Sequence, residues 1–478
     1  MNVLANLEPK DVFKYFEELS QIPRGSGNEQ EVSDYLVKFA KDLGLEVAQD
    51  EALNVIIKKN AAKGMENAPG IILQGHMDMV NEKNTDVVHN FLKDPLKLYI
   101  EGDYIRAKGT TLGGDNGIAV ALSMAILAGD YKHPPLAVLI TTDEEAGMSG
   151  AKAVDFACLD GYNYLINLDS GDDRTFTVSC AGGIRHAIEF NLDFTDTPKD
   201  YTSYKLQVRG LFGGHSGEDI GKNLANSNRL MARLLWDLKD RILLSHLSGG
   251  AKNNAIPREA DAIISFAGAD KEKVMDSFKR MEAVFKKEFA ETEPNLTLVI
   301  EETDFASSSF TGCITKKILQ GLILIPLGLN STNKKGENIS SNNIGVVTTS
   351  DNKVVLDCLS RANILSKRDF YQEQLKTLAE LLDAEYKAHN TYSGWESKTD
   401  SSLKNACTEV YENLFGETPD TISIHGGVEC GIFAEKNPNL DMISYGPDMY
   451  HLHTPEEKLN IPSTGKVYKF LIALLESL

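Results

Sequence analysis

His76 and Asp78 are the first residues along the chain whose types and spacing indicate chemistry. They stand two positions apart in the segment Leu73–Val80, directly after a short apolar run that predicts a buried strand. On an extended backbone, residues i and i+2 point to the same side. An imidazole beside a carboxylate suits a metal site, where one group ligates and the other fixes the tautomer of the ring. An ordinary polar strand end has the same pattern, so residues elsewhere in the chain must distinguish a metal site from a strand end.

Two further predicted strands also run directly into acidic residues. Leu136–Thr142 leads into the triplet Asp143–Glu145, and Tyr164–Leu168 leads into Asp169. Asp115 lies in a glycine-rich turn, where glycines allow tight folding and let one carboxylate project into a crowded place. These acids have simpler interpretations as well: the triplet as a solvated acidic run, and Asp169 as a turn former.

Together these positions contain enough ligands for two metal ions. The candidate ligands are His76, Asp115, Glu145, Asp169 and His453, with Asp78 and Glu144 beside them. Two imidazoles and three carboxylates suit a pair of Zn²⁺ ions with one bridging carboxylate. Two ions about 3.5–4 Å apart can hold a hydroxide between them and polarise a carbonyl. They do not supply a proton acceptor, and Glu144, adjacent to a ligand, fits that role.

Other interpretations of these and neighbouring motifs remain to be compared. His451 stands two residues before His453, and either one could be the ligand. The glycine-rich segment 109–117 resembles a phosphate-binding loop, but it lacks both the Lys-Ser/Thr and the G-x-G-x-x-G pattern. Cys430 near His425 could suggest thiol catalysis, although no residue order supports it and a buried small side chain is the simpler interpretation.

The elements that must position these residues alternate between strand and helix. Amphipathic spacing predicts helices within residues 7–22 and 32–43, with Gly44 as the C-terminal stop, and another helix at Ile118–Ala128. Short apolar strands interleaved with helices predict an α/β fold with a mostly parallel central sheet flanked by helices. Ligands bind at the carboxyl ends of such strands, which is where the acids and histidines stand.

The pattern changes near residue 187 and returns near residue 393. Between them, alternating strands such as Tyr204–Arg209 surround long predicted helices at Asn223–Lys239, Lys271–Ala290 and Arg368–Ala388. We therefore predict a discontinuous catalytic domain, residues 1–186 and 393–478, with an inserted α+β lid domain at 187–392. The insertion reads as two similar halves.

Composition limits the classes of partner and compartment. The chain has 478 residues, 42% of them hydrophobic, and a formal charge of −20, which argues against nucleic acid or an anionic membrane as a partner. No apolar run approaches the length of a membrane span, and the start of the chain does not resemble a secretion signal. The six cysteines are scattered without C-x-x-C spacing, which favours reduced thiols and a cytoplasmic location.

Six blocks, read in order, resemble a known family. GHMDMV, GTTLGGDNGIAVA, TTDEEAGMSGA, NLDSGD, GGHSGEDI and HLHTPEE occur in the order found in the co-catalytic zinc peptidases of the aminoacylase and carboxypeptidase-G-like family. The resemblance spans nearly the whole chain. It implies that Asp115 bridges two metals, with His76 and Asp169 completing one site and Glu145 and His453 the other.

The same resemblance implies roles for further residues. Asp78 orients His76, Glu144 is the general base that passes its proton to the leaving amine, and His215 stabilises the developing oxyanion. Residues expected to contact the substrate are Asn254, Arg361, Gly426, Gly427 and Glu429. The simpler interpretation of His215 is a helix neighbour without chemistry.

The expected activity is that of a dinuclear metallo-dipeptidase acting on unblocked dipeptides, including those of the β-Ala-His type. Chain length and the wording of the blocks resemble the family members with that activity. The cofactor would be two Zn²⁺ per chain, with Mn²⁺ or Co²⁺ as substitutes. Alternatives on the same scaffold are a tripeptidase, an N-acyl amino acid deacylase or a carboxypeptidase, and outside enzymes a non-catalytic metal- or peptide-binding protein. The only expected partner is a small peptide; a homodimer is compatible with the chemistry but not required.

Overall fold

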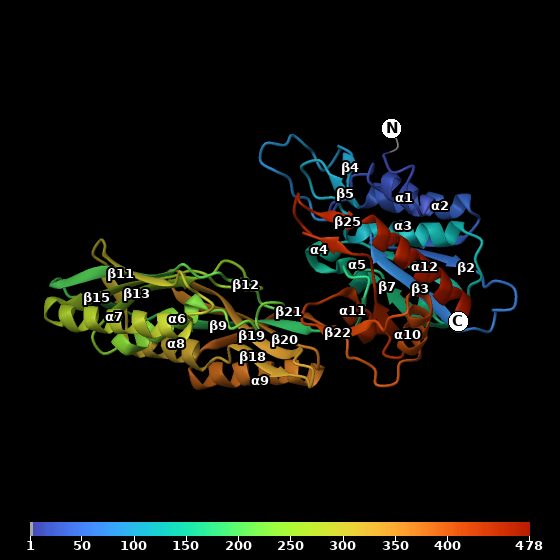
Figure 1. Cartoon of the computed structure of the whole chain (residues 1–478). Coiled ribbons are helices and arrows are strands. Elements are labelled where there is room, and N and C mark those ends of the chain that lie inside the picture. The colour runs from blue at the N-terminus through green and yellow to red at the C-terminus, as the bar shows by residue number, and fades with distance from the viewer. Residues whose placement is uncertain (1–2) are drawn as a thin grey trace. The chain divides into compact units, whose positions relative to one another are not determined.

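The computed structural model describes residues 3–478 and divides them into two compact units (Figure 1). Unit 1 contains the chain up to Ser179 together with Ser397–Ile422 and Val428–Leu478. Unit 2 contains Cys180–Glu396 and the five-residue turn Ser423–Gly427. Unit 2 exceeds the expected insertion at 187–392 by residues 180–186, by residues 393–396 and by this turn, all of which were expected in the catalytic domain.

Unit 1 is built on an eight-stranded sheet with the order β1-β2-β6-β3-β7-β23-β8-β22. Its strands are β1 (Glu46–Gln49), β2 (Val55–Lys59), β3 (Gly70–His76), β6 (Leu136–Thr141), β7 (Tyr162–Asn167), β8 (Thr175–Cys180), β22 (Asp420–Ile424) and β23 (Asp441–Ser444). The central strands β6, β3, β7 and β23 run parallel, and the flanking β2 and β8 pair antiparallel. The mostly parallel α/β sheet predicted from the sequence is confirmed.

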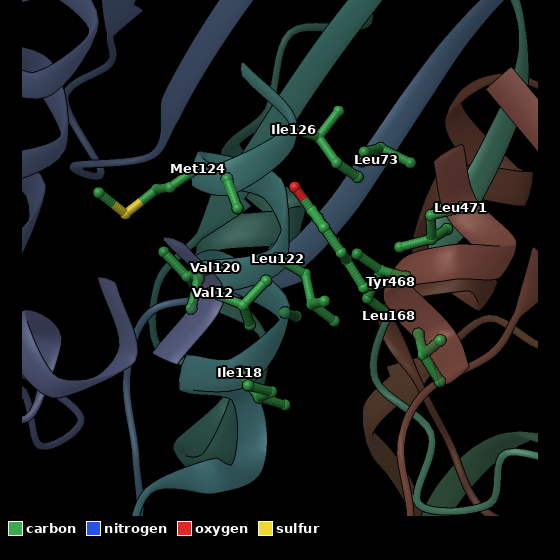
Figure 2. Close-up of a cluster of buried hydrophobic side chains, with 14 of the residues drawn as sticks. Val12, Leu73, Ile118, Val120, Leu122, Met124, Ile126, Leu168, Tyr468 and Leu471 are labelled. Carbon is green, nitrogen blue, oxygen red and sulfur yellow. The ribbon is translucent and has the colours of Figure 1, made fainter. Parts of the chain in front are cut away.

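Helices pack against this sheet. They are α1 (Lys10–Leu19), α2 (Gln30–Asp42), α3 (Gly114–Ala128), α4 (Glu144–Gly147), α5 (Ser149–Ala153), α10 (Ser402–Phe415), α11 (Glu429–Lys436) and α12 (Ile461–Ser477), with a 3₁₀ turn at Phe156–Leu159. Helix α3 is apolar on nearly every side because it lies between other elements, as Figure 2 shows for Val12 of α1 and Leu73 of β3. Gly44 follows α2 with a positive φ of 71°, as expected of a C-terminal stop.

The parallel strands place the predicted site residues at one edge of the sheet. β3 ends at His76, β6 ends just before Asp143, and β7 ends just before Asp169. The strands themselves are buried; every residue of β3 and β6 is inaccessible. Since these strands are parallel neighbours, their carboxyl ends meet, and the polar residues that follow them converge.

Unit 2 is built on a nine-stranded antiparallel sheet. Its main path is β16-β11-β15-β13-β19-β20-β9-β21, and β18 pairs with β19 beside it. The strands are β9 (Gly182–Asn191), β11 (Tyr201–Arg209), β13 (Leu243–Gly249), β15 (Ala260–Ala267), β16 (Thr297–Glu302), β18 (Gly328–Thr332), β19 (Asn338–Thr349), β20 (Lys353–Ala362) and β21 (Glu385–Tyr392). Its helices are α6 (Ser227–Leu238), α7 (Lys271–Glu288), α8 (Gly312–Leu324) and α9 (Leu365–Leu381), and a 3₁₀ turn spans Gly268–Asp270.

Small sheets complete both units. In unit 1, β4 (Leu98–Glu101), β5 (Tyr104–Ala107), β24 (Met449–Tyr450) and β25 (Lys458–Asn460) form a four-stranded sheet. In unit 2, β10 (Phe194–Asp196) pairs with β17 (Ser308–Phe310), and β12 (Gly214–His215) pairs with β14 (Ala255–Ile256).

Two expectations for unit 2 are wrong in detail, and one of its strands was missed. The helix predicted over 368–388 ends at Leu381, and Glu385–Tyr392 is instead the edge strand β21, which pairs with β9. The helix predicted from Asn223 begins at Ser227, where the side chain of Asn226 caps it. Strand β13 was not anticipated.

Between residues 3 and 478, no helix is both long and apolar enough to cross a membrane.

Candidate metal centre

The five predicted ligands come together in unit 1. Three groups of side chains place their ligand atoms within 4.8 Å of one another: His76 with Asp115 and Asp169, Asp115 with Glu145 and His453, and His76 with Glu144 and Glu145. His451 belongs to none of the groups found among the described residues, so the choice between the two histidines falls on His453. The interpretations of Asp143–Glu145 as a solvated run and of Asp169 as a turn former do not account for this convergence.

Asp115 has the position of a bridge. Its Oδ1 lies 3.1 Å from Nε2 of His76, and its Oδ2 lies 3.3 Å from Nε2 of His453. The two histidines then reach different carboxylates: His76 is 3.8 Å from Oδ1 of Asp169, and His453 is 2.9 Å from Oε1 of Glu145. The two oxygens of the Asp115 carboxylate therefore face two adjoining groups of candidate metal ligands.

The electrostatics of the cluster call for added positive charge. Burial, and then the neighbouring Asp115, raise the pKa of Asp169 well above its ordinary value. Burial and Asp169 do the same to the pKa of Glu144. Burial also opposes ionisation of Asp115, but hydrogen bonds with His453 and His76 hold its pKa well below the usual range. Two divalent cations would neutralise this excess of carboxylates, and nitrogen and oxygen donors suit Zn²⁺. The candidate ligands therefore fit a pair of zinc ions.

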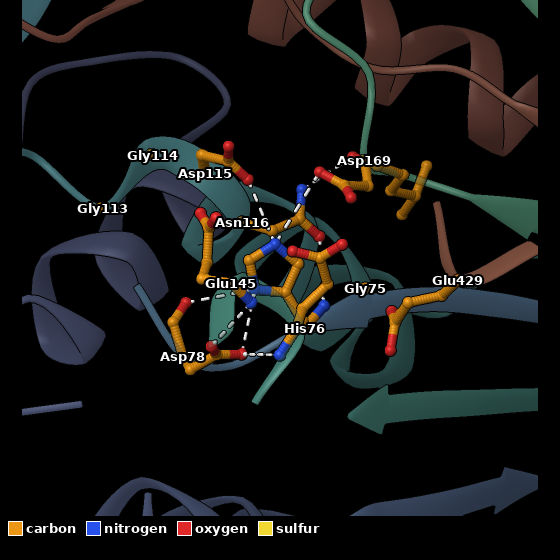
Figure 3. A network of polar contacts seen from close by, with 12 residues as sticks. Gly75, His76, Asp78, Gly113, Gly114, Asp115, Asn116, Glu145, Asp169 and Glu429 are labelled. Carbon is orange, nitrogen blue, oxygen red and sulfur yellow. Dashed lines mark hydrogen bonds and ion pairs between the residues drawn. The ribbon is translucent and has the colours of Figure 1, made fainter. Parts of the chain in front are cut away.

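Asp78 holds His76 and the Glu144–Glu145 turn in one arrangement (Figure 3). Its Oδ1 lies 3.2 Å from Nδ1 of His76, which leaves Nε2 of the ring facing Asp115. The same carboxylate accepts hydrogen bonds from the backbone N–H groups of Glu144 at 3.1 Å and Glu145 at 3.2 Å, and from the hydroxyl of Ser26. One buried side chain thus orients the histidine and anchors the turn that carries the proposed base.

Replacement of Asp78 with asparagine is expected to lower metal affinity by about 10–100-fold, the usual loss when a group behind a ligand is removed. An amide would turn N–H donors toward the backbone N–H groups of Glu144 and Glu145. Zinc titration against a competing chelator measures the effect. Ser26→Ala, which removes one hydrogen bond to the same carboxylate, is the control and is expected to lose less. Equal losses in the two variants would contradict this role for Asp78.

Three further residues position the centre and were missed from the sequence. Glu457 accepts hydrogen bonds from the backbone N–H groups of residues 112–115 at 2.8–3.3 Å. The buried Arg24 donates to the carbonyls of Met77, Asp78 and Gly113. Asn116 accepts from the backbone N–H of His76 and donates to the carbonyl of Leu168. These side chains look like ordinary polar residues in the sequence because their partners are distant in the chain.

Replacing Glu457 with glutamine is expected to lower the free energy of unfolding by about 1–3 kcal/mol, because buried backbone donors lose their acceptor. Urea unfolding measures this. The adjacent Glu456 is exposed and paired with Arg106, so Glu456→Gln is the matched control, with an expected change of about 0–1 kcal/mol. A control as destabilised as Glu457→Gln would contradict the assignment.

Glu429, expected to contact substrate, lies inside unit 1. Its side chain is fully buried, and its Oε2 accepts hydrogen bonds from Gln74 at 2.6 Å and Thr141 at 2.9 Å. Burial raises its pKa to about 7. With no exposed surface, Glu429 supports the strand ends from within unit 1, and its role as a substrate contact stays a prediction. Cys430 is buried as well.

The other expected substrate residues belong to unit 2. His215 pairs with Ala255 across β12 and β14, and the N–H of Ser216 donates to the carbonyl of Asn254. Arg361 is buried on β20 and donates to the hydroxyl of Tyr392 at 2.8 Å. The turn that contains Gly426 and Gly427 also lies in unit 2: the carbonyl of Gly426 accepts from the N–H of Ala181, and Gly427 packs so closely on Tyr392 that a Cβ would lie 2.8 Å from its ring.

His215 is prepared to act as a neutral donor. Its Nδ1 accepts a hydrogen bond from the backbone N–H of Glu218, so in the neutral ring the proton sits on Nε2. Burial, and then the charge of Arg361, lower the pKa of His215. His425, which was discussed only in relation to Cys430, is held between Ser341 and Asn363, and burial lowers its pKa to about 4.

Comparison with known proteins identifies the family. Residues 72–477 match the family described as Peptidase family M20/M25/M40. The chain is 38% identical to the cytosol non-specific dipeptidase of Escherichia coli (strain K12), over 100% of this chain and 99% of that protein. The crystal structure of aminoacylhistidine dipeptidase from Vibrio alginolyticus matches with a TM-score of 0.92 and 36% identity, covering 99% of this chain and 98% of that one.

A tripeptidase from Staphylococcus aureus shares the fold, with a TM-score of 0.60 and 16% identity over 98% of both chains. The family match extends over most of the chain, and the matched residues include all five candidate metal ligands. The chain belongs to Peptidase family M20/M25/M40, and it is a hydrolase that acts on peptide bonds.

Proposed function

We propose that the protein is a dinuclear zinc dipeptidase that hydrolyses unblocked dipeptides, including those with a C-terminal histidine. The observation that carries the proposal is the orientation of Asp115, whose two oxygens face two different histidines. The names of the relatives support the substrate class: one is a non-specific dipeptidase and the other an aminoacylhistidine dipeptidase. The name of the first also supports a cytosolic location, as do the scattered cysteines, which lack C-x-x-C spacing.

The side chains of unit 1 would divide the work of holding two ions. His76 and Asp169 complete one site, Glu145 and His453 complete the other, and Asp115 serves both. When bound, a pair of zinc ions polarises the scissile carbonyl and acidifies a water molecule. Asp78 keeps the proton of His76 on Nδ1, so that Nε2 remains available as a ligand.

Glu144 is proposed to move the proton. It takes a proton from the attacking water and donates it to the amine that leaves when the peptide bond breaks. Its backbone N–H is anchored by Asp78, and its carboxylate lies within 4.8 Å of the ligand atoms of His76 and Glu145. Burial raises its pKa, which makes its carboxylate a stronger proton acceptor.

Unit 2 is proposed to contact the substrate. His215, with its proton on Nε2, would donate a hydrogen bond to the developing oxyanion. Arg361 is suited to the terminal carboxylate of a dipeptide, because its Nε is buried without a hydrogen-bond partner. Asn254, Gly426 and Gly427 would line the same region. The inserted domain would act as a lid that brings these residues to the substrate.

Metal analysis of the purified protein and a panel of substrates test the function. We expect about two metal ions per chain, and hydrolysis of β-Ala-His and other free dipeptides but not of their N-acetylated forms. Preferential cleavage of N-acetyl amino acids would favour a deacylase, and preferential cleavage of free tripeptides a tripeptidase. Loss of only the C-terminal residue from longer peptides would favour a carboxypeptidase. Metal binding without turnover of any substrate would favour a binding protein.

A further inference from the structure

Unit 2 contains a cavity of about 370 Å³ that plays no part in the proposed peptide hydrolysis. It lies along α6 and extends to Phe289 at the end of α7 and to residues 327–329 at the start of β18. Much of its wall is apolar, including Leu224, Ile256, Phe289 and Leu329. Its volume falls within the range of small-molecule sites, which combine apolar walls with a few polar groups.

Two arginines one helical turn apart supply the charge of this cavity. Arg233 is neutralised, because its Nη1 and Nη2 donate to both carboxylate oxygens of Glu288 at 2.6 and 2.8 Å. Arg229 donates from Nη2 to the carbonyl of Ile325, and within residues 3–478 no carboxylate forms an ion pair with it.

The guanidinium of Arg229 is incompletely satisfied. Its Nε is buried and has no hydrogen-bond partner among the described residues. Burial lowers the pKa of Arg229, and the nearby Arg233 lowers it further. Acidic residues are abundant in the chain, which has an excess of twenty negative charges. Arg229 nevertheless lacks an acidic partner at the described wall of the cavity. Its Nη1 also has no hydrogen-bond partner among the described residues and is not buried, so this is the group that can meet an acceptor in the cavity.

We propose that this cavity binds a small monoanion with an apolar body, an alkyl or aryl-alkyl carboxylate, with its carboxylate on Arg229. A planar guanidinium matches a carboxylate with two parallel hydrogen bonds. The hydrocarbon body packs against Leu224, Phe289 and Leu329. Only one uncompensated charge lines the cavity, so a single negative charge is the match.

The cavity also adjoins the segment that carries His215. Its wall residue Ile256 pairs with Gly214 across β12 and β14, and its wall residue Ile220 follows the same segment. Asp219, just before Ile220, accepts a hydrogen bond from the N–H of His215 at 2.7 Å. A ligand in the cavity therefore packs against residues 214–220 and stabilises them. We expect slower amide hydrogen exchange in these residues when the ligand binds.

Binding of 4-phenylbutyrate to the full-length, zinc-loaded protein tests the proposal by calorimetry, with the neutral 4-phenylbutanamide as the matched compound. We expect the carboxylate to bind at least about tenfold more tightly than the amide, the size of one charge-assisted pair. Carboxylates also bind metal centres, so the variant Arg229→Met locates the site and is expected to weaken binding by about tenfold or more. Arg280→Met is the control, since the exposed Arg280 pairs with Asp237 outside the cavity wall.

A second variant keeps the test decisive if Arg229→Met does not fold. Glu288→Gln removes the partner of Arg233 and leaves a second free charge at the cavity, so carboxylate binding is expected to tighten by about threefold or more. Equal affinity for carboxylate and amide would overturn the proposal, as would wild-type affinity in a folded Arg229→Met protein. Unchanged affinity in Glu288→Gln would also overturn it, and so would inorganic phosphate binding as tightly as 4-phenylbutyrate.

Discussion

Replacing Glu144 with glutamine is expected to lower kcat for dipeptide hydrolysis by about 10²–10⁴-fold, the usual contribution of a positioned general base. The amide has nearly the shape of the carboxylate but cannot accept a proton from water. The backbone N–H of residue 144 still reaches Asp78, so the turn and the metal ligands keep their places. Steady-state kinetics on a free dipeptide measure the loss, and metal analysis should still give about two ions per chain.

Asp143→Asn is the matched control for this experiment. Asp143 precedes Glu144 in the same turn, and its carboxylate accepts a hydrogen bond from Ser149 rather than joining the metal-ligand groups. Its positive φ of 55° is a conformation that asparagine tolerates well. We expect a change of less than about tenfold. A fully active Glu144→Gln enzyme, or an equal loss in both variants, would show that another group accepts the proton.

Replacing Asp115 with asparagine is expected to remove metal from both sites at once. An amide offers one oxygen where the structure has two, one beside His76 and one beside His453. Removing a group that merely orients a ligand lowers metal affinity by about 10–100-fold. Removing a ligand shared by both sites should therefore lower metal affinity by more than about 100-fold. Metal content after dialysis should fall from about two ions per chain to nearly none, with a matching loss of activity.

Asp172→Asn controls for the removal of one negative charge. Asp172 belongs to a second acidic group, with Asp173 and Asp448, but it is exposed, and Asp173 in that group is already paired with Lys466. This variant should retain two ions and full activity. If Asp115→Asn lost only one of two ions and kept the other at wild-type affinity, Asp115 would be a ligand of one site only.

The site could be predicted largely because its residues follow buried strands. Residues 71–73 and 136–140 are continuous apolar runs, and such runs fill the centre of a parallel sheet, whose order then brings their carboxyl ends together. The residue types that follow, His76 and Asp169 among them, stand where polar groups are otherwise costly. Pattern and chemistry agreed at these positions, so the convergence of these side chains could be expected without knowledge of the tertiary contacts.

The sequence could not predict the elements whose structure depends on contacts with residues far away along the chain. Residues 385–392 are mostly exposed and polar, and they form strand β21 because β9 offers an edge to pair with. Nothing local distinguishes them from the end of the preceding helix. Glu457 and Arg24 are similar cases: each satisfies backbone groups far away along the chain, and neither contributes a recognisable motif.

The span of these supports has a consequence for biosynthesis. Arg24 and Glu457, which stand more than four hundred positions apart, both hold the backbone around Gly113. A polypeptide that has been synthesised only as far as residue 450 has neither His453 nor Glu457, and therefore lacks two of the groups that build the candidate site. A truncated chain that stops before His453 should therefore bind metal poorly, however well its earlier strands fold.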